Sequence, residues 1–226
     1  PTAGTYVTTT QTITPSPLSG KAEITREAWD QGGNPQLSGL LWGQMTREWF
    51  EDLENATATF LNTLTAAADI ALPAGAADDA LDGAWSTANT NLQFIRGGHR
   101  FRAFAVHIDL YQKFAAAVDS TGRRLYPIIG AQNATGTAAP RWGTLDLGGV
   151  TGVPSWALGP TTLPTGTSSN SWLFNPMDVH GWASAPQRLQ FEYQVKTIEI
   201  GIWGYKAHAN TRIDGVRQVA YDPTGA

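Results

Sequence analysis

One amphipathic stretch, residues 34–64, constrains the fold more than any other part of the sequence. Apolar side chains recur there every three or four residues, the spacing of one face of an α-helix. Asn34 and Pro35 suit the cap and the first helical position. We therefore predict one helix of about 45 Å, with Gly39 and Gly43 as the weakest points. Its apolar face is formed by Leu37, Leu41, Met45, Trp49, Leu53, Ala56, Phe60 and Leu64.

Three later segments alternate apolar and polar residues, which is the period of β-strands with one side in solvent. They are QRLQFEYQV (187–195), TIEIGIWGYKAHA (197–209) and GVRQVAY (215–221). In the longest segment Ile198, Ile200 and Ile202 share one side, and Glu199 and Trp203 lie on the other. A single helix cannot bury its own apolar face, so we expect this sheet to cover it.

The first 33 residues are rich in Thr and are predicted to form an extended arm that ends in a short strand. Pro15 and Pro17 lack the N–H group that a strand donates to its neighbour, so this arm is expected to be an edge strand or a crossing segment rather than a central strand. An open edge invites a partner, and we expect the arm to be ordered by neighbouring copies of the chain.

Shorter elements of both kinds are predicted between the long helix and the last strands. A helix at 77–95 is followed by a buried strand at 100–108 and a helix at 109–118, capped by Asp109. Short strands are predicted at Thr144–Leu147, Pro154–Leu158 and Ser171–Phe174. The positions expected to be buried in the two helices are Leu81, Trp85, Leu92, Ile95, Leu110, Phe114 and Val118.

The composition excludes several classes of function. Only 15% of residues are charged, which fits either a Thr-, Ser- and Asn-rich solvated surface or a surface covered by partner subunits. The net charge of −4 argues against sequence-independent nucleic-acid binding, which needs clustered Lys and Arg. The absence of cysteine fits folding in a reducing cytoplasm. No apolar run reaches the length of a membrane span, and we predict no membrane partner.

The sequence offers no pattern typical of catalysis. His99, His107, His180 and His208 lack the spacing of metal ligands, and His107 is expected in a strand, either packed or at the solvent edge. Neither a phosphate-binding glycine loop nor a nucleophile elbow is present. We predict no enzyme activity, no catalytic residue, no metal and no cofactor.

Clusters of charge and the tryptophans leave alternatives open. The carboxylates at 51–54 and 78–82 are expected on wet helix faces, although paired carboxylates also serve glycosidases. The cluster Arg96, His99, Arg100 and Arg102 could hold a phosphate, but a solvated strand or a subunit carboxylate explains it equally. Trp49 and Trp85 are expected in the core. The nine tryptophans also allow a carbohydrate-binding or glycoside-cleaving module, with a cleft lined by Trp142, Trp156 or Trp172.

Several longer passages, in their order along the chain, resemble one known family. They are KAEITREAWDQGGNPQLSGLLWGQMTREWFEDLENATATFL (21–61), FRAFAVHIDLYQKFAAAVDSTGRRLYP (101–127), GGVTGVPSWALGPTTLPTGT (148–167), SWLFNPMDVHGWASAPQRLQFEYQ (171–194) and IEIGIWGYKAHANTRIDGVRQVAYDP (198–223). They resemble the strand and spine helix, the strand–helix–turn with D-x-x-G-R, the G-x-P-V segment and the closing strands of the major capsid protein of tailed bacteriophages. The resemblance covers nearly the whole chain.

This resemblance implies an α+β chain with the Hong Kong 97-type capsid fold. Residues 18–65 and 187–210 would form the peripheral domain, in which the spine helix packs on an antiparallel sheet. Residues 66–186 and 211–226 would form an α/β axial domain, and residues 1–17 the remnant of an extended loop. The outgoing strand of that loop and the N-terminal arm are missing, and Pro1 is not an initiator Met, so we expect a processed or shortened product.

The implied function is structural. Copies of the chain would form pentamers and hexamers of an icosahedral shell around double-stranded DNA, with a scaffold or maturation protease and a portal as assembly partners. The shell would be assembled in the host bacterial cytoplasm and would form the virion capsid. DNA would be held by confinement rather than at a specific site. An encapsulin-like nanocompartment shell is the nearer alternative. The inter-subunit contacts are predicted to involve Arg47, Glu51, Glu54, Arg100, Arg102 and Arg123.

Overall fold

The computed structural model describes residues 10–31, 36–65, 68–75, 77–94, 101–126, 129–132, 138–140, 144–159, 169–194 and 197–223. The chain divides into two compact units. The first contains residues 1–53 and 181–211, and the second contains residues 54–180 and 212–226. No described helix is both long and apolar enough to cross a membrane.

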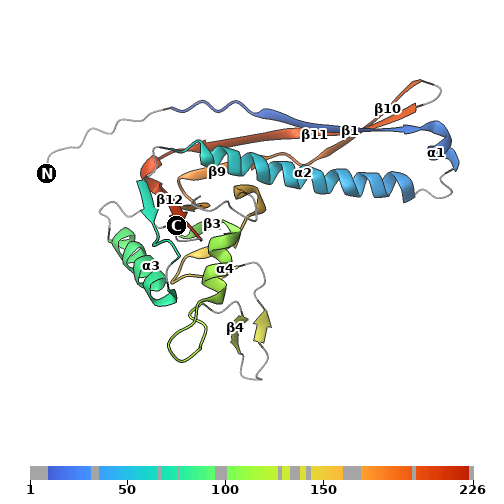
Figure 1. The fold of residues 1–226 in the computed structure, drawn as a ribbon. Helices are drawn as coiled ribbons and strands as arrows, with labels where there is room; N and C mark the ends of the chain where they lie inside the picture. Colours follow the sequence, from blue (N-terminus) through green and yellow to red (C-terminus); the bar gives the residue numbers. More distant parts are fainter. Residues whose placement is uncertain are drawn as a thin grey trace. The chain divides into compact units, whose positions relative to one another are not determined.

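The first unit contains an antiparallel sheet with the strand order β1–β11–β10 (Figure 1). Strand β1 (Ser16–Thr25) runs against β11 (Thr197–Asn210) over its full length. Strand β10 (Gln187–Gln194) pairs with the other side of β11, as does β9 (Val179–Ala183). Strand β1 is therefore an edge strand, as its prolines predicted, and the predicted strands at 187–195 and 197–209 are confirmed.

A short helix that was not predicted follows β1. Helix α1 (Arg26–Gln31) replaces the end of the expected extended arm. Its first turn is capped by Thr25, whose hydroxyl oxygen accepts a hydrogen bond from the main-chain N–H of Ala28 at 3.3 Å. Threonine is a common N-cap residue, and here it ends the strand and starts the helix.

The long helix forms as one piece. Helix α2 (Gln36–Asn62) has 27 residues, which corresponds to about 40 Å, and it is unbroken at Gly39 and Gly43. Asn34 and Pro35, the predicted start signals, lie outside the described residues. In the first unit Met45 is 7% exposed and packs in one apolar cluster with Ile198, Ile200 and Ile202 of β11. Strands β1 and β11 therefore cover the helix, as expected for the segment 197–209. The prediction that the segment 215–221 belongs to the same sheet was wrong, because that strand lies in the sheet of the second unit.

Helix α2 and strand β11 approach each other closely at Gly204. A Cβ atom built on Gly204 would lie 2.5 Å from Cη2 of Trp49 and 2.5 Å from Oγ of Ser184. Trp49 is only 3% exposed, so its ring is enclosed by neighbouring residues. Glycine at position 204 therefore lets the large indole lie directly on the strand, which continues the row formed by Ile198, Ile200 and Ile202.

The second unit is built on a six-stranded mixed sheet in the order β2–β12–β8–β3–β7–β6. The strands are β2 (Ala68–Ala71), β12 (Val216–Tyr221), β8 (Ser169–Phe174), β3 (Ala103–Val106), β7 (Thr151–Pro154) and β6 (Leu145–Asp146). The pairs β2/β12 and β3/β7 are parallel, and the other pairs are antiparallel. A separate pair is formed by β4 (Ile129–Gln132) and β5 (Ala138–Pro140).

Two helices complete the core of the second unit. Helix α3 (Asp78–Gln93) buries Leu81, Trp85 and Leu92 as predicted, whereas Ile95 lies outside the described residues. Helix α4 (Ile108–Ala116) buries Leu110 and Phe114, also as predicted. The Trp85 ring stacks on Phe104 of β3 at 5.2 Å between centroids and meets the Phe114 ring edge-on at 5.6 Å. These aromatic contacts join both helices to the sheet.

Three local predictions were wrong. Helix α4 is capped by the side chain of His107, not by Asp109, because His107 Nδ1 accepts from the main-chain N–H of Asp109. Val118 is 39% exposed, since the helix ends at Ala116 and the chain turns away. The strand predicted at Pro154–Leu158 is instead the end of β7 followed by a 3₁₀ turn, η1 (Trp156–Leu158).

The buried face of α2 also shifts along the helix. In its last turns Ala58 and Leu61 are each 3% exposed, whereas the predicted Ala56, Phe60 and Leu64 are only partly buried. The reason is that these turns belong to the second unit and pack in a separate cluster. That cluster also contains Leu158, Trp172 and Val216. A helix that packs in two separate hydrophobic clusters does not bury one continuous line of residues along its length.

The contact at Gly204 gives a sharp test of how the first unit is held together. We expect Gly204→Ala to lower the free energy of unfolding by about 2 kcal/mol, because either the Trp49 ring or the strand must move. Gly201→Ala is the matched control on the opposite side of β11, where the new Cβ would meet nothing closer than 3.7 Å. Urea denaturation followed by tryptophan fluorescence measures both. Equal stabilities would show that Trp49 is not held against this strand.

Candidate assembly surfaces

The predicted contact residues of α2 differ in their surroundings. Arg47 and Glu51 are exposed in the first unit, and neither forms an ion pair with any residue that the structure describes. Glu54 is partly buried, so its expected place on the wet face of the helix was wrong. Its Oε1 accepts a hydrogen bond of 2.6 Å from the Ser155 hydroxyl. Arg47 and Glu51 therefore remain available to a partner, whereas Glu54 already has an intramolecular role.

The remaining predicted contacts lie in the second unit. Arg102 is exposed beside β3, where its main chain bonds to Thr151 and Phe174. Arg123 is exposed in the turn after α4. Arg100, like Arg96 and His99 of the basic cluster, lies outside the described residues. The six residues divide between the two units, and their role in subunit contacts stays a prediction.

The DSTGR turn that carries Arg123 is tightly built. Asp119 Oδ1 accepts hydrogen bonds from the main-chain N–H groups of Thr121 and Arg123, both at 2.8 Å, and from the Thr121 hydroxyl at 2.7 Å. These bonds hold the pKa of Asp119 below its ordinary value, with the Thr121 hydroxyl as the largest cause. Gly122 has φ of +80°, a conformation that favours glycine. The turn thus presents Arg123 on a fixed backbone.

A charged pair links the start of α3 to the end of α4. Lys113 Nζ lies 2.8 Å from Asp78 Oδ1, and Asp78 Oδ2 accepts from the main-chain N–H of Val118 at 3.0 Å. The hydrogen bond from Lys113 and then that from Val118 lower the pKa of Asp78 below its ordinary 3.8. Tyr126 similarly donates a short hydrogen bond to Asp82, and burial raises the tyrosine pKa. Asp78 and Asp82 are therefore engaged within the second unit, whereas Asp79 is exposed, as expected for a wet helix face.

The Asp78 pair has a pH-dependent consequence. The pKa of the Asp78 carboxyl is lower in the folded chain than its ordinary 3.8, so the pair stabilises the folded chain at pH values above 3.8. This contribution is lost as the pH falls through the pKa that Asp78 has in the folded chain. We expect Asp78→Asn to cost about 1 kcal/mol at pH 7. The difference from the unmodified chain should vanish in acid. Urea denaturation at a series of pH values measures this, with Asp79→Asn at the neighbouring exposed position as control. A difference that persists unchanged at pH 2.5 would contradict the assignment.

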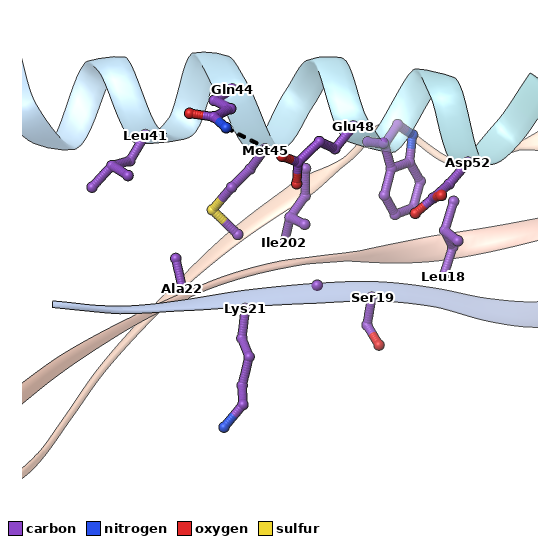
Figure 2. Close-up of a pocket in the computed structure, with 12 residues that line it drawn as sticks. Leu18, Ser19, Lys21, Ala22, Leu41, Gln44, Met45, Glu48, Asp52 and Ile202 are labelled. Atoms are coloured by element: carbon purple, nitrogen blue, oxygen red, sulfur yellow. Dashed lines mark hydrogen bonds between the residues drawn. The ribbon is translucent and has the colours of Figure 1, made fainter.

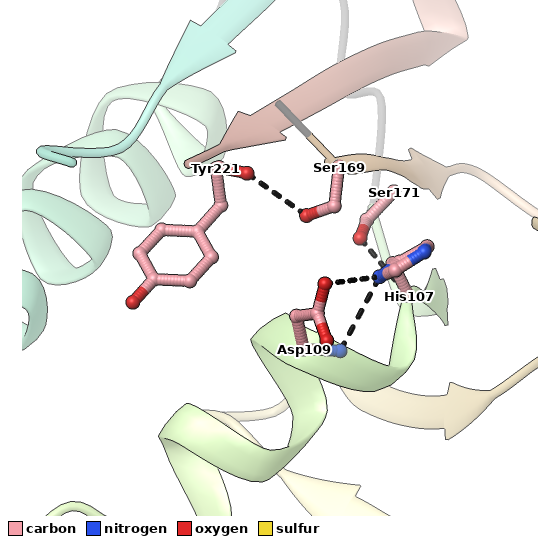
Figure 3. Close-up of polar contacts among 5 residues, drawn as sticks. All are labelled: His107, Asp109, Ser169, Ser171 and Tyr221. Carbon is pink, nitrogen blue, oxygen red and sulfur yellow. Dashed lines mark hydrogen bonds and ion pairs between the residues drawn. The ribbon is translucent and has the colours of Figure 1, made fainter. Parts of the chain in front are cut away.

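Polar groups gather around His107 at the start of α4 (Figure 3). His107 is 1% exposed, and its Nδ1 lies 3.3 Å from the main-chain N of Asp109 and 3.5 Å from Asp109 Oδ2. The Ser171 hydroxyl oxygen accepts from the main-chain N–H of His107, not from the imidazole. The Ser169 hydroxyl donates to the carbonyl of Tyr221. Serine, histidine and aspartate are thus close together without the hydrogen bond that would activate a serine.

The imidazole is also closed to substrates. His107 Nε2 and Asp109 Oδ2 lack a hydrogen-bond partner among the described residues, and both are buried. A Cβ atom on Gly159 would lie 3.0 Å from Nε2, so the main chain of that residue covers the ring. Ser171 is 0% exposed. The expectation of a packed histidine is confirmed, but its expected place in a strand was wrong, because β3 ends at Val106 and His107 caps α4.

Trp172 does not line a cleft, as the carbohydrate alternative would require. Trp172 is 1% exposed, and its indole N–H donates to the Asn62 side chain at 3.1 Å, so it belongs to the core. Trp156 is 50% exposed, and Trp142 lies outside the described residues. Trp49 and Trp85 are buried as predicted. Within the described parts of the chain no group of three or more acidic or histidine side chains could hold a metal ion.

One arrangement was not anticipated from the sequence. Lys21 on β1 lies 3.0 Å from Glu23 Oε1 and 3.7 Å from Glu199 Oε2, which is on β11. Glu23 is directly opposite Glu199 in the register of the two strands, so the lysine offsets two like charges. The only signal for it in the sequence is the spacing Lys-x-Glu, which has meaning once the strand pairing is known.

Comparison with known proteins identifies the fold. No family model and no curated protein matches the sequence. Among solved structures, a chain of Gordonia phage Cozz matches with a TM-score of 0.59 at 16% identity, covering 98% of this chain and 78% of that one. The capsid of an empty GTA particle matches with a TM-score of 0.62 at 11% identity, covering 93% and 73%. The SrpI encapsulin of Synechococcus elongatus PCC 7942 matches with a TM-score of 0.58 at 14% identity, covering 91% and 73%.

These likenesses extend over nearly the whole chain at identities too low to indicate more than architecture. The α+β prediction, with a long helix packed on an antiparallel sheet and a second unit of mixed structure, is confirmed. The chain has the Hong Kong 97-type fold.

Proposed function

We propose that this chain is the major capsid protein of a tailed bacteriophage and acts as a structural subunit rather than as an enzyme. The observation that carries the proposal is the match of 98% of the chain to a Gordonia phage protein and 93% to a GTA capsid. The order of the sequence motifs points to the same family. A buried His107 cluster without an activated serine is consistent with a structural role.

In this proposal the two compact units have separate tasks. Residues 18–65 and 187–210 act as the peripheral domain, and residues 66–186 and 211–226 as the axial domain around the five- and six-fold axes. Support comes from the division of the chain after residues 53 and 180, which separates a helix-on-sheet unit from a mixed unit. Residues 1–17 act as the remnant of an extended loop.

Assembly would rest on many weak contacts. Each subunit touches several copies, so modest interfaces add up to a stable shell. Ring-closing contacts between unlike surfaces give pentamers and hexamers. With a net charge of −4, the chain would hold double-stranded DNA by confinement and counterions. A scaffold or maturation protease and a portal would take part during assembly in the host bacterial cytoplasm, and the product is the virion capsid.

The decisive experiment is electron microscopy of the purified chain together with sedimentation velocity over a range of concentrations. We expect rings or shells that become more abundant as concentration rises. The physical reason is that association through several weak contacts depends steeply on concentration. A chain that stays monomeric at every concentration, with intact secondary structure by circular dichroism, would contradict the proposal.

The predicted charged contacts can be tested one at a time. We expect Arg123→Glu to raise the concentration needed for assembly about fivefold, which corresponds to about 1 kcal/mol. The reason is that an attraction between Arg123 and a carboxylate of a neighbouring copy would become a repulsion between two negative charges at an exposed contact. The Asp119 turn that holds residue 123 uses main-chain groups, so the fold should persist. Arg188→Glu, at an exposed position of β10, serves as a control. Light scattering measures assembly, and equal effects of both variants would assign the change to net charge alone.

A second candidate, an encapsulin-like nanocompartment shell, is favoured by the match to SrpI encapsulin at a TM-score of 0.58. The two candidates predict the same subunit fold and differ in the content of the shell. Purified shells from cells that also express the neighbouring genes would contain DNA in the first case and a protein cargo in the second. Nuclease protection and mass spectrometry of the shell content separate them.

A further inference from the structure

A pocket of about 210 Å³ lies between β1 and α2 in the first unit (Figure 2). Its walls are largely apolar, with Leu41 and Met45 of the helix facing Ala22 of β1. Ile202 of β11 also borders it, and Gly20 of β1 adds no side chain, so part of the space stays unfilled. A water molecule takes about 30 Å³ in the liquid, so the cavity is large enough for a molecule of about seven non-hydrogen atoms.

Two carboxylates of α2 lie at the rim of this pocket. Glu48 and Asp52 both line it, both are exposed, and their spacing of four residues places them on one face of the helix. Figure 2 shows the two carboxyl groups directed from α2 towards β1. Glu48 accepts a hydrogen bond of 3.3 Å from the Gln44 amide, whereas Asp52 forms no ion pair with any residue that the structure describes. The rim therefore carries two negative charges that can accept further donors.

Lys21 also borders the pocket but does not neutralise this rim. Its side chain points away from α2 (Figure 2), and its Nζ lies 3.0 Å from Glu23 Oε1 and 3.7 Å from Glu199 Oε2. Side chains alternate along a strand, so Lys21, Glu23 and Glu199 lie on the side of the sheet opposite to Ala22. The pocket is thus an apolar cavity whose rim keeps its negative charge.

An apolar cavity with an anionic rim favours one class of small molecule. A hydrocarbon chain gains free energy when it leaves water for the apolar walls. A primary ammonium group has three N–H donors and no acceptor, so it can donate to Glu48 and Asp52 while an attached chain lies in the cavity. The rim would repel an anion, and a neutral molecule of the same length would lack the charge-assisted hydrogen bonds. Volume and charge together therefore favour an amphipathic cation of about seven non-hydrogen atoms.

We propose that the β1–α2 pocket binds linear primary alkylammonium ions with a chain of about six carbons. The chain lies against Leu41, Met45 and Ala22, and the ammonium group donates to Glu48 and Asp52. The occupant is a free amine. Lysine side chains of other proteins share this chemistry, and the test separates the two sources. The site goes beyond the proposed function, because it lies within the first unit of one chain and requires neither assembly nor DNA.

Three ligands with the same hydrocarbon chain test the chemistry of the site. Hexylamine, hexanol and hexanoate are titrated into the full chain, diluted until it sediments as a monomer, and binding is followed by ligand-observed NMR. We expect saturable binding of hexylamine with a dissociation constant on the order of 1 mM, which suits a ligand of about seven non-hydrogen atoms. Hexanol should bind about tenfold more weakly, and hexanoate should not bind. Absence of hexylamine binding, or equal affinities of hexylamine and hexanol, overturns the proposal.

Removal of one rim charge tests what holds the ammonium group. Asp52→Asn keeps the size of an exposed side chain, so the fold and the pocket should persist. We expect hexylamine to bind about fivefold more weakly and hexanol to bind as before, because only the charged ligand loses its partner. Glu51→Gln is the matched control, since Glu51 is exposed on the same helix but does not line the pocket. An equal loss of hexylamine affinity in both variants overturns the assignment of the rim.

A pocket-filling substitution tests the apolar part of the site. A Cβ on Gly20 would lie 3.4 Å from Ile202 Cγ2, which is an ordinary contact, so Gly20→Val should enter the cavity without unfolding the unit. We expect an unchanged or higher melting temperature and about tenfold weaker binding of both hexylamine and hexanol. Gly201→Ala, on the other side of the sheet, is the control. Equal ligand affinities of these two variants overturn the pocket assignment.

The outcomes separate this site from other occupants and from the proposed function. A lysine-rich peptide that binds to the unmodified chain but not to Asp52→Asn, with no binding of hexylamine, overturns the free-amine assignment. All titrations use the monomeric chain, so failure of hexylamine to bind overturns this site and leaves the capsid proposal intact. Hexylamine binding by a chain that forms no rings or shells supports the site and contradicts only the capsid proposal.

Discussion

The first unit depends on the contact between the Trp49 ring and the main chain at Gly204. Helix α2 approaches β11 closely because this position has no side chain, and the indole then shares one apolar layer with Ile198, Ile200 and Ile202. Most helix stability in folded proteins comes from tertiary packing of this kind. This packing explains how α2 continues through Gly39 and Gly43. A Cβ atom at either position would have no neighbouring atom within 4 Å, so these two glycines are not required by close packing.

The same helix shows how far the sequence predicts the structure. Its existence, length and main partner follow from periodicity, because long amphipathic patterns are little affected by context. The end of the buried stripe was placed at Ala56, Phe60 and Leu64, but Ala58 and Leu61 are buried more deeply. Periodicity assumes one core on one side, and the sequence does not reveal that the helix passes from one compact unit into another.

The errors at the surfaces have a different physical origin. Glu54 is partly buried because it bonds to Ser155, which is distant in the sequence. The cap of α4 was misassigned because a histidine, an unexpected residue type for a cap, accepts the main-chain hydrogen bond. Pairs such as Lys113 and Asp78 are likewise fixed by tertiary structure. Candidate contact residues chosen from charge alone therefore divide into residues with internal partners and residues such as Arg47, Glu51 and Arg123 that stay exposed.

This division gives the low charge of the chain a physical meaning. Several of the few charged groups, including Asp78, Lys113 and Lys21, are engaged within the subunit. The remaining surface carries little net charge and many hydroxyl and amide groups. Copies of such a chain repel one another weakly, because long-range repulsion grows with net charge. Short-range complementarity, such as pairing at an open strand edge, can then decide how copies meet. A surface of this kind is compatible with the proposed role as a capsid subunit.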